Sequence, residues 1–360
     1  MTEDTPLFDF KVKSIVHDYE VQFISNTRES LIQELKEGDF IIIDRKVKNL
    51  YCNELNDILE NNKHIIIDAT EKQKSFQELI PVIQHLIDNG FRKNHRLIGI
   101  GGGITQDITA FTSSIIYRGV DWLFYPTTLL AQGDSCIGSK TSINFGAFKN
   151  QIGGFYPPNK ILINPAFLDS LSDAEMKSGL GEMCHYFIVA SEADFKRYKQ
   201  DYPQALVDKE VLAGIIARSL EIKKSYIEID EFDRNERQVF NYGHSFGHAI
   251  ESLTNYRIPH GIAVSYGMDM ANFVSVKLGY ISEYTRQEIR ELLEKIWNGT
   301  SINDICLDKF SQTISKDKKN VGKELRLILN KGYGKIFKDA VKNDERFISW
   351  LKEYFENELN

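Results

Sequence analysis

Two histidines lie four residues apart in the segment NYGHSFGHAIE, residues 241–251, which we expect to be helical. Residues at positions i and i+4 share one face of a helix, so His244 and His248 can face a common ligand. The same spacing holds zinc in HExxH helices. The pair can therefore belong to a metal site, grip a phosphate group, or only form a polar stripe on a packed helix.

Further metal-binding side chains occur elsewhere in the sequence. His260 follows in RIPHGIAV, at the expected start of another helix, and Glu182 sits in GLGEMCHYF with His185 three residues later. A catalytic zinc needs about three nitrogen or oxygen ligands and one open position. Single histidines are mostly solvent-facing or hydrogen-bonded in a core. The set favours a metal site, because small residues beside it indicate close packing: Gly181, Gly243, Gly247 and Gly261.

A second polar group is suited to anionic oxygens. The stretch DSCIGSKTSINFGAFKNQIGG places Lys140, Lys149 and Asn150 among glycines. Arg237 and the DKK run at 317–319 add positive charge. Surface lysines usually serve solubility, but the glycine-rich setting of the first two lysines favours anion binding.

The sequence RLIGIGGGITQDITAF runs from an expected strand, through Gly101, Gly102 and Gly103, into an expected helix. Glycines let the backbone approach a phosphate, and the helix N-terminus supplies free N–H groups. The segment is not a GxGxxG fingerprint, so it is either a nucleotide-binding turn or only a tight connection. Asp68 and Glu71 can accept hydrogen bonds from ribose hydroxyls or cap the next helix.

The elements that must position these residues change in type along the chain. In residues 1–160, strand-like and helix-like segments alternate, which predicts an α/β domain with a parallel sheet flanked by helices. The expected strands are FIIID (40–44), HIIID (64–68), RLIGIG (96–101) and DWLFYPTT (121–128), with a helix before Gly90. Residues 161–360 predict a mostly α-helical domain, whose final charged helix (343–358) should be a solvated face.

Composition limits the class of protein. The 360 residues favour two domains, and no apolar run approaches the ~20 residues of a membrane span. The start, MTEDTPLFDFKVK, lacks a secretory pattern, and the 4 scattered cysteines disfavour a disulfide framework, so we expect a cytoplasmic protein. The net charge of -7 argues against nucleic acid as the main partner.

Taken together, the ordered segments resemble the 3-dehydroquinate synthase superfamily of sugar-phosphate cyclases. The resemblance spans roughly residues 65–335 and rests on TEKQKS, GGGITQD, YRGV, PTTLLAQGDSCIGSKT, FKNQIGGFYPP, SGLGEM, NYGHSFGHAIE, PHGIAV and KDKKN, in that order. It implies a Rossmann-like, NAD-binding domain in residues 1–160, a helical metal- and substrate-binding domain in residues 161–360, and an active site between them.

The resemblance also implies roles for single residues. Glu182, His244 and His260 would bind Zn²⁺ or Co²⁺, while His248 and Asn241 would face the substrate phosphate. Further contacts to the substrate would come from Lys140, Asn150, Lys318, Asp134, Lys223, Asp233, His185, Arg237, and Arg118 reaching across a homodimer. NAD contacts would come from Glu71, Lys74, Gly101, Gly102, Gly103, Ile104, Asp107, Thr127, Thr128, Lys140 and Lys149.

The implied reaction closes an open keto-sugar acid phosphate into a carbocycle. The metal would polarise the C4 and C5 oxygens, and NAD would take a hydride from C5. The departing phosphate could remove the C6 proton. Return of the hydride, ring opening and an intramolecular aldol step would complete the reaction, so the protein would mainly supply anion contacts and hold one flexible substrate.

Several residues depart from the family pattern. Arg237 is retained at the position that grips a substrate carboxylate, which favours an acidic substrate. His185 replaces a lysine, Ile262 replaces a glutamate beside His260, and Asp233 replaces a glutamate. These changes leave room for a specialised substrate such as sedoheptulose 7-phosphate, and Ile262 removes a carboxylate that could support the metal site.

In the glycine-rich segments, Gln106 and Ser139 each replace a glycine.

Two other classes of function compete with a cyclase. A metal-containing, NAD-dependent polyol dehydrogenase would share the two-domain plan but would not need the phosphate contacts. A non-enzymatic scaffold would be expected to have lost a metal ligand or a lysine. The ligand set does not distinguish zinc from cobalt.

Overall fold

The computed structural model describes residues 8–146, 148–315 and 324–359. The chain forms two compact units, which are described separately. The first consists of the residues up to Leu171 together with Ile216–Phe232, and the second consists of Ser172–Ile215 and the residues from Asp233 onward. The assignment of NAD binding to residues 1–160 and of metal binding to residues 161–360 stays a prediction.

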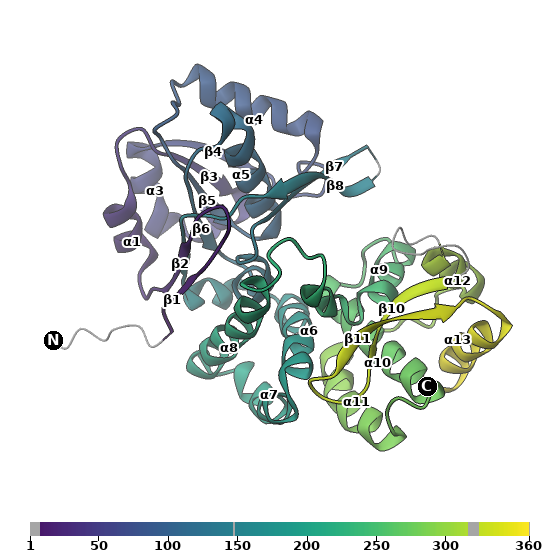
Figure 1. Cartoon of the computed structure of the whole chain (residues 1–360). Helices are drawn as coiled ribbons and strands as arrows, with labels where there is room; N and C mark the ends of the chain where they lie inside the picture. Colours follow the sequence, from purple (N-terminus) through teal and green to yellow (C-terminus); the bar gives the residue numbers. More distant parts are fainter. Residues whose placement is uncertain (1–7, 147, 316–323, 360) are drawn as a thin grey trace. The chain divides into compact units, whose positions relative to one another are not determined.

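The first unit is built on a seven-stranded sheet in the order β1-β2-β9-β6-β5-β3-β4 (Figure 1). β1 pairs antiparallel with β2, and the other neighbours pair in parallel. The strands of the sheet are β1 Phe10–Val12, β2 Tyr19–Phe23, β3 Phe40–Asp44, β4 Lys63–Ile67, β5 Leu97–Gly101, β6 Trp122–Pro126 and β9 Lys160–Ile163, and a separate hairpin joins β7 Lys140–Phe145 to β8 Phe148–Phe155.

Helices cover both faces of this sheet. They are α1 Thr27–Glu34, α2 Arg45–Leu50, α3 Cys52–Asn61, α4 Phe76–Asp88 and α5 Gly103–Ile115, with the short turns η1 Ile116–Arg118, η2 Ala131–Ser135 and η3 Pro165–Ser170. One face packs with α1, α2 and α3 through Leu31, Val47, Leu55, Ile58, Leu59, Ile41, Ile43, Ile98, Ile100 and Leu123. On the other face, a Cβ on Gly99 of β5 would lie 2.8 Å from Thr109 Oγ1 of α5, so helix and sheet touch here.

The predicted α/β domain is therefore confirmed. Isoleucine-rich runs become β3 and β5 because a parallel sheet covered on both faces buries continuous apolar segments, and a third such run becomes the partly buried edge strand β4. The expected helix before Gly90 is α4, with Gly90 at a φ of +74° directly after it. Ser75 caps α4, so neither Asp68 nor Glu71 does. The two N-terminal strands and β9 were not predicted.

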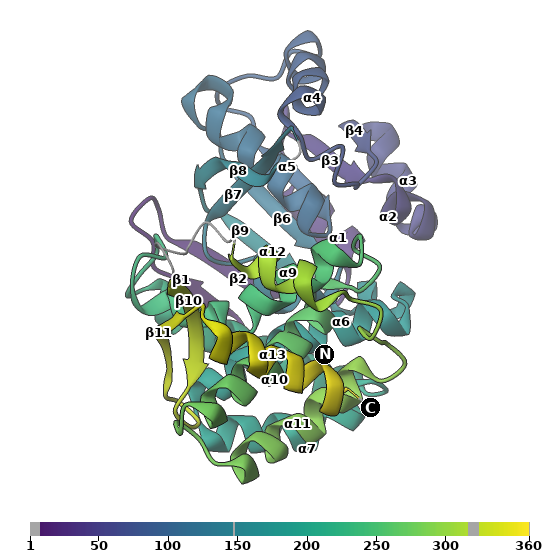
Figure 2. The same cartoon turned by 90° about the vertical axis from the view of Figure 1, so that its right-hand side faces the viewer.

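The second unit is mostly helical, as predicted. Its elements are α6 Asp173–Ala190, α7 Glu192–Ala205, η4 Glu236–Asn241, α9 His244–Leu253, α10 His260–Lys277, α11 Glu283–Trp297, α12 Leu307–Ser315 and α13 Glu345–Asn357, with a hairpin of β10 Glu324–Asn330 and β11 Ile336–Lys342 that was not predicted. Helix α8 Lys209–Ile227 has residues in both units. Every residue of α10 from 261 to 275 is buried, so α10 forms the centre of this unit (Figure 2).

The final charged helix is not only a solvated face. Phe347, Leu351 and Tyr354 of α13 are buried, and the Tyr354 hydroxyl donates to Asp269 Oδ2 of α10 at 2.8 Å. All four cysteines are free. Among the described residues, none of the helices combines the length and the apolar character that crossing a membrane requires.

Candidate metal and dinucleotide sites

Three helices of the second unit bring the predicted metal ligands together. Glu182 lies in the middle of α6, while His244 and His260 are the first residues of α9 and α10. A Cβ on Gly181 would lie 2.4 Å from the carbonyl oxygen of Gly261, so α6 and α10 approach more closely than any larger residue would allow. The predicted role of these glycines in close packing is confirmed.

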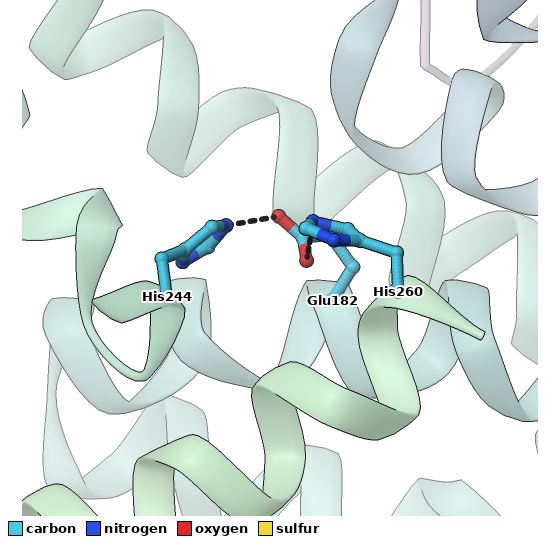
Figure 3. Close-up of side chains that lie close together, drawn as sticks. All are labelled: Glu182, His244 and His260. Atoms are coloured by element: carbon cyan, nitrogen blue, oxygen red, sulfur yellow. Dashed lines mark ion pairs between the residues drawn. The ribbon is translucent and has the colours of Figure 1, made fainter. Parts of the chain in front are cut away.

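The three side chains point toward one another (Figure 3). His244 Nε2 lies 3.4 Å from Glu182 Oε1, and His260 Nε2 lies 3.4 Å from Glu182 Oε2. One ligand atom from each residue falls within 4.8 Å of the others. Two imidazoles and one carboxylate form the nitrogen and oxygen donor set of a catalytic zinc or cobalt site.

The surroundings of Glu182 fit a cation. Its side chain is 4% exposed, and within the described part of the chain Oε2 accepts no hydrogen bond. Burial opposes ionisation, but the neighbouring imidazoles of His244 and His260 hold the pKa of the Glu182 carboxyl well below its usual range. A divalent cation held by the same residues would stabilise the carboxylate in the same way.

Each histidine is oriented by its second ring nitrogen. His260 Nδ1 lies 3.0 Å from Glu251 Oε2, and His244 Nδ1 lies 3.2 Å from the carbonyl oxygen of Tyr242. Donation from Nδ1 leaves Nε2 as the ligand atom. Glu251 was missed from the sequence, although its place three residues after His248 and seven after His244 sets it on the same helix face. His248, Glu251 and His260 also form a group that could hold a metal ion.

His185, the histidine that replaces a lysine, is completely buried beside this group. Its Nδ1 lies 3.8 Å from Glu182 Oε1, which is too long for a hydrogen bond. Its ring lies 4.0 Å from that of Tyr186 and 5.7 Å from that of Phe240, measured between centroids. The structure thus places a flat, aromatic-packed side chain next to the metal ligand.

The other predicted residues of the second unit that the structure describes lie near His244 in the sequence. Arg237 is buried in η4, and Asn241 at its end donates from Nδ2 to the carbonyl oxygen of Gln238 at 3.1 Å. The His248 ring stacks on that of His260 with centroids 5.7 Å apart. Asp233 has a φ of +55°. Lys318 lies outside the described residues.

In the first unit, the glycine turn connects β5 to α5. Gly102 is the residue before the first turn of α5, and a Cβ there would lie 2.9 Å from Thr128 Cγ2. A Cβ on Gly101 would lie 2.3 Å from Thr105 Oγ1. At Gly103, the nearest atom to such a Cβ is Ser135 Oγ at 3.9 Å. The first two glycines are therefore needed for packing, while a side chain at Gly103, before Ile104, would make only an ordinary contact.

Predicted NAD contacts form a connected polar network beside this turn. Lys74 Nζ bonds Asp107 Oδ2 at 2.7 Å. Glu71 pairs with Lys149 at 3.2 Å and accepts from Asn144 Nδ2 at 2.8 Å. Burial opposes ionisation of Glu71, but Asn144 and the two lysines lower its pKa. Asp107 differs, because burial raises its pKa despite Lys74. Thr127 and Thr128 follow β6, and the Thr127 N–H donates to the carbonyl oxygen of Gly101 at 3.0 Å.

The remaining predicted residues of this unit lie on the β7–β8 hairpin, on the turns η1 and η2, and on helix α8. Lys140 begins β7, and Asn150 of β8 has a φ of +54° and accepts from Ser142 Oγ at 3.2 Å. Asp134 in η2 and Lys223 in α8 pair at 2.8 Å. Arg118 ends η1 with a φ of +64°.

Comparison with known proteins matches most of the chain to one family. Residues 64–178 match the family described as 3-dehydroquinate synthase N-terminal, and residues 179–320 match 3-dehydroquinate synthase C-terminal. A 3-dehydroquinate synthase of Thermoanaerobacter pseudethanolicus is 34% identical over 312 residues, which cover 85% of this chain and 88% of the relative.

Solved structures share the fold at lower identity. A 2-deoxy-scyllo-inosose synthase complexed with carbaglucose-6-phosphate, NAD+ and Co2+ superposes with a TM-score of 0.82 at 20% identity, over 96% of this chain and 99% of that one. A 2-epi-5-epi-valiolone synthase from Streptomyces hygroscopicus subsp. jinggangensis 5008 with NAD+ and Zn2+ bound has a TM-score of 0.83 at 22% identity, over 96% and 98%.

Proposed function

This chain belongs to the 3-dehydroquinate synthase family of carbon–oxygen lyases, and from that premise we propose that it is an NAD- and metal-dependent 3-dehydroquinate synthase. Its reaction would be the loss of phosphate from a keto-sugar acid phosphate, followed by closure of the carbon ring. The observation that carries the proposal is the convergence of Glu182, His244 and His260 in a chain of this family.

These three residues would hold Zn²⁺ or Co²⁺, the ions named for the two related structures. When bound, the metal would polarise substrate oxygens, and NAD would accept a hydride and return it. In this chain, Glu251 and the Tyr242 carbonyl would keep the histidine Nε2 atoms directed at the metal.

The first unit would hold NAD. The helix N-terminus after Gly102 suits a phosphate group of the dinucleotide. The proposed contacts are Glu71, Lys74, Gly101, Gly102, Gly103, Ile104, Asp107, Thr127, Thr128, Lys140 and Lys149. The Lys74–Asp107 and Glu71–Lys149 pairs support this assignment, because they tie the segment between β4 and α4 to α5 and to β8.

Contacts to the substrate divide by charge. Lys140, Asn150, Lys318, Asn241 and His248 would take the phosphate, and Arg118 would reach the partner subunit's site in a homodimer. Arg237 would grip the carboxylate, because a guanidinium matches the geometry of a carboxylate in two parallel hydrogen bonds. Asp134, Lys223 and Asp233 would hold hydroxyls, with His185 beside the metal. We also expect the protein to work in the cytosol.

Phosphate release tests this function. Purified protein with NAD and Zn²⁺ or Co²⁺ is mixed with 3-deoxy-arabino-heptulosonate 7-phosphate, and in parallel with sedoheptulose 7-phosphate and with glucose 6-phosphate. We expect release from the heptulosonate alone. Glu182→Ala should abolish it, whereas Glu210→Ala, which removes an exposed glutamate of α8, should not.

Two results would contradict the proposal. Release from a neutral sugar phosphate would mean a specialised cyclase, with His185 and Ile262 marking the changed pocket. NADH formation from a polyol without phosphate release would mean a dehydrogenase, for which the phosphate contacts have no use.

A further inference from the structure

The turn η2, Ala131–Ser135, has an unusual system of supports. Its backbone is wound more widely than an α-helix, with the Cys136 N–H donating to the Ala131 carbonyl five residues earlier at 3.1 Å. Three successive carbonyl oxygens of this turn accept hydrogen bonds from side chains of other elements. The donors are Ser219 Oγ to Gly133 at 2.8 Å, Lys223 Nζ to Asp134 at 2.6 Å, and Gln106 Nε2 to Ser135 at 2.6 Å.

The contact from Gln106 is reciprocal. Ser135 Oγ donates to Gln106 Oε1 at 2.6 Å while Gln106 Nε2 donates to the Ser135 carbonyl, so two bonds fix both the position and the orientation of the amide. The Gln106 side chain is buried, which makes unpaired amide atoms costly there. Both hydrogen bonds of the pair must therefore form together or be lost together.

This pair links the glycine turn to the residues that would hold substrate. Gln106 lies in the first turn of α5, where its N–H donates to the Gly102 carbonyl at 3.0 Å. Ser135 directly follows Asp134, whose carboxylate is 2.8 Å from Lys223 Nζ. Two buried side chains from α5 and α8 thus hold adjacent peptide units, and the carboxylate of Asp134 projects from between them.

We propose that Gln106 is a positioning residue that fixes η2, and through it the Asp134–Lys223 pair, against the glycine turn. Its contribution to the reaction would be indirect, because both polar atoms of its amide are hydrogen-bonded to Ser135. The inference rests on the proposed function for its kinetic consequence, but the structural link itself can be tested without any substrate.

The test uses the full chain with Gln106→Ala and with Gln106→Met. Methionine keeps the length and nearly the volume of glutamine but removes both hydrogen bonds, so it separates bonding from packing. Gln77→Ala, which removes an exposed glutamine of α4, is the matched control. In the absence of substrate, hydrogen–deuterium exchange of peptides covering residues 129–137 should become about tenfold faster in both Gln106 variants and stay unchanged in the control.

In turnover assays, both Gln106 variants should lose about tenfold in kcat/KM for the sugar phosphate while the Kd for NAD stays within twofold. A Ser135→Ala change made in the Gln106→Met background should cost little more, because the two side chains act through one shared bond. Wild-type rates in Gln106→Met would overturn the proposal, since packing alone would then suffice. So would a loss confined to NAD affinity, which would make Gln106 a cofactor contact.

The two proposals fail in different ways. If the wild-type protein releases no phosphate from any sugar, the proposed function is wrong, and exchange at residues 129–137 still decides the structural link. If the wild type is active and exchange is unchanged in both Gln106 variants, only the role of Gln106 is wrong.

Discussion

Removal of the Glu251 carboxylate should weaken metal binding without touching a ligand. Glu251 Oε2 lies 3.0 Å from His260 Nδ1, and His260 Nε2 lies 3.4 Å from Glu182 Oε2. Without this carboxylate, the imidazole loses the contact that favours a proton on Nδ1, so its tautomer and its orientation are less well defined. Glu251→Ala therefore acts on the fraction of molecules in which Nε2 is available to the metal.

The expected loss of metal affinity depends on how far solvent is excluded from the contact between Glu251 and His260. The Glu251 side chain is only 14% exposed, so water replaces the carboxylate poorly. Loss of such a partner typically lowers metal affinity by about 10–100-fold, which corresponds to roughly 1.4–2.7 kcal/mol. Glu251→Gln should lose less, about threefold, because its amide oxygen still accepts from Nδ1 but no longer carries a charge.

Competition with a chelator measures the Kd for Zn²⁺ directly on metal-stripped protein, independently of turnover. Glu353→Gln, which removes a charge from a half-exposed residue of α13 paired with Lys277, serves as the control and should bind as the wild type does. If Glu251→Ala binds Zn²⁺ within twofold of the wild type while Glu182→Ala does not bind, the orientation of His260 does not depend on Glu251 and the reasoning is refuted.

Three further changes test the second unit. Asp269→Asn should destabilise the fold by about 3 kcal/mol in urea unfolding, because Arg286, 1% exposed, loses the charge it bonds at 3.1 Å with two nitrogens; an unchanged midpoint would contradict this. Gly261→Ala should lower the thermal midpoint and the zinc affinity together, since its Cβ would lie 1.8 Å from the Ser178 carbonyl oxygen; zinc binding of wild-type strength would argue against it. Arg237→Lys should raise KM for the acidic substrate at least tenfold, measured by phosphate release, because one ammonium cannot form the paired bonds of a guanidinium. Equal KM values would mean that Arg237 does not bind the substrate carboxylate.

Local patterns were enough to predict the framework. The runs at 40–44 and 96–101 became the fully buried strands β3 and β5, because continuous apolar segments fit a sheet covered on both faces, and the run at 64–68 became the partly buried edge strand β4. Gly90 follows the C-terminal end of α4, as expected. In each case, the signal lies within one turn or one strand of the element that it specifies.

What could not be predicted depends on contacts between distant segments. The pairing of β2 with β9 joins residues near 21 to residues near 161, and no periodicity within either strand identifies its partner. The same holds for Gln106 and Ser135, 29 positions apart, because a glutamine in the first turn of a helix gives no sign of which carbonyl it will bind. Glu251 was also missed, but it could have been found, because its spacing sets it on the same helix face as His244 and His248.

Glu251 also changes the meaning of the departure at Ile262. The resemblance placed a glutamate at this position beside His260, so its loss suggested a weakened metal site. In the structure, Ile262 is 2% exposed within α10, where an unpaired carboxylate would be costly to bury. The carboxylate that His260 needs comes instead from the preceding helix, α9, through Glu251. The isoleucine therefore alters the packing next to the candidate metal ligands, while the contact between Glu251 and His260 Nδ1 is present.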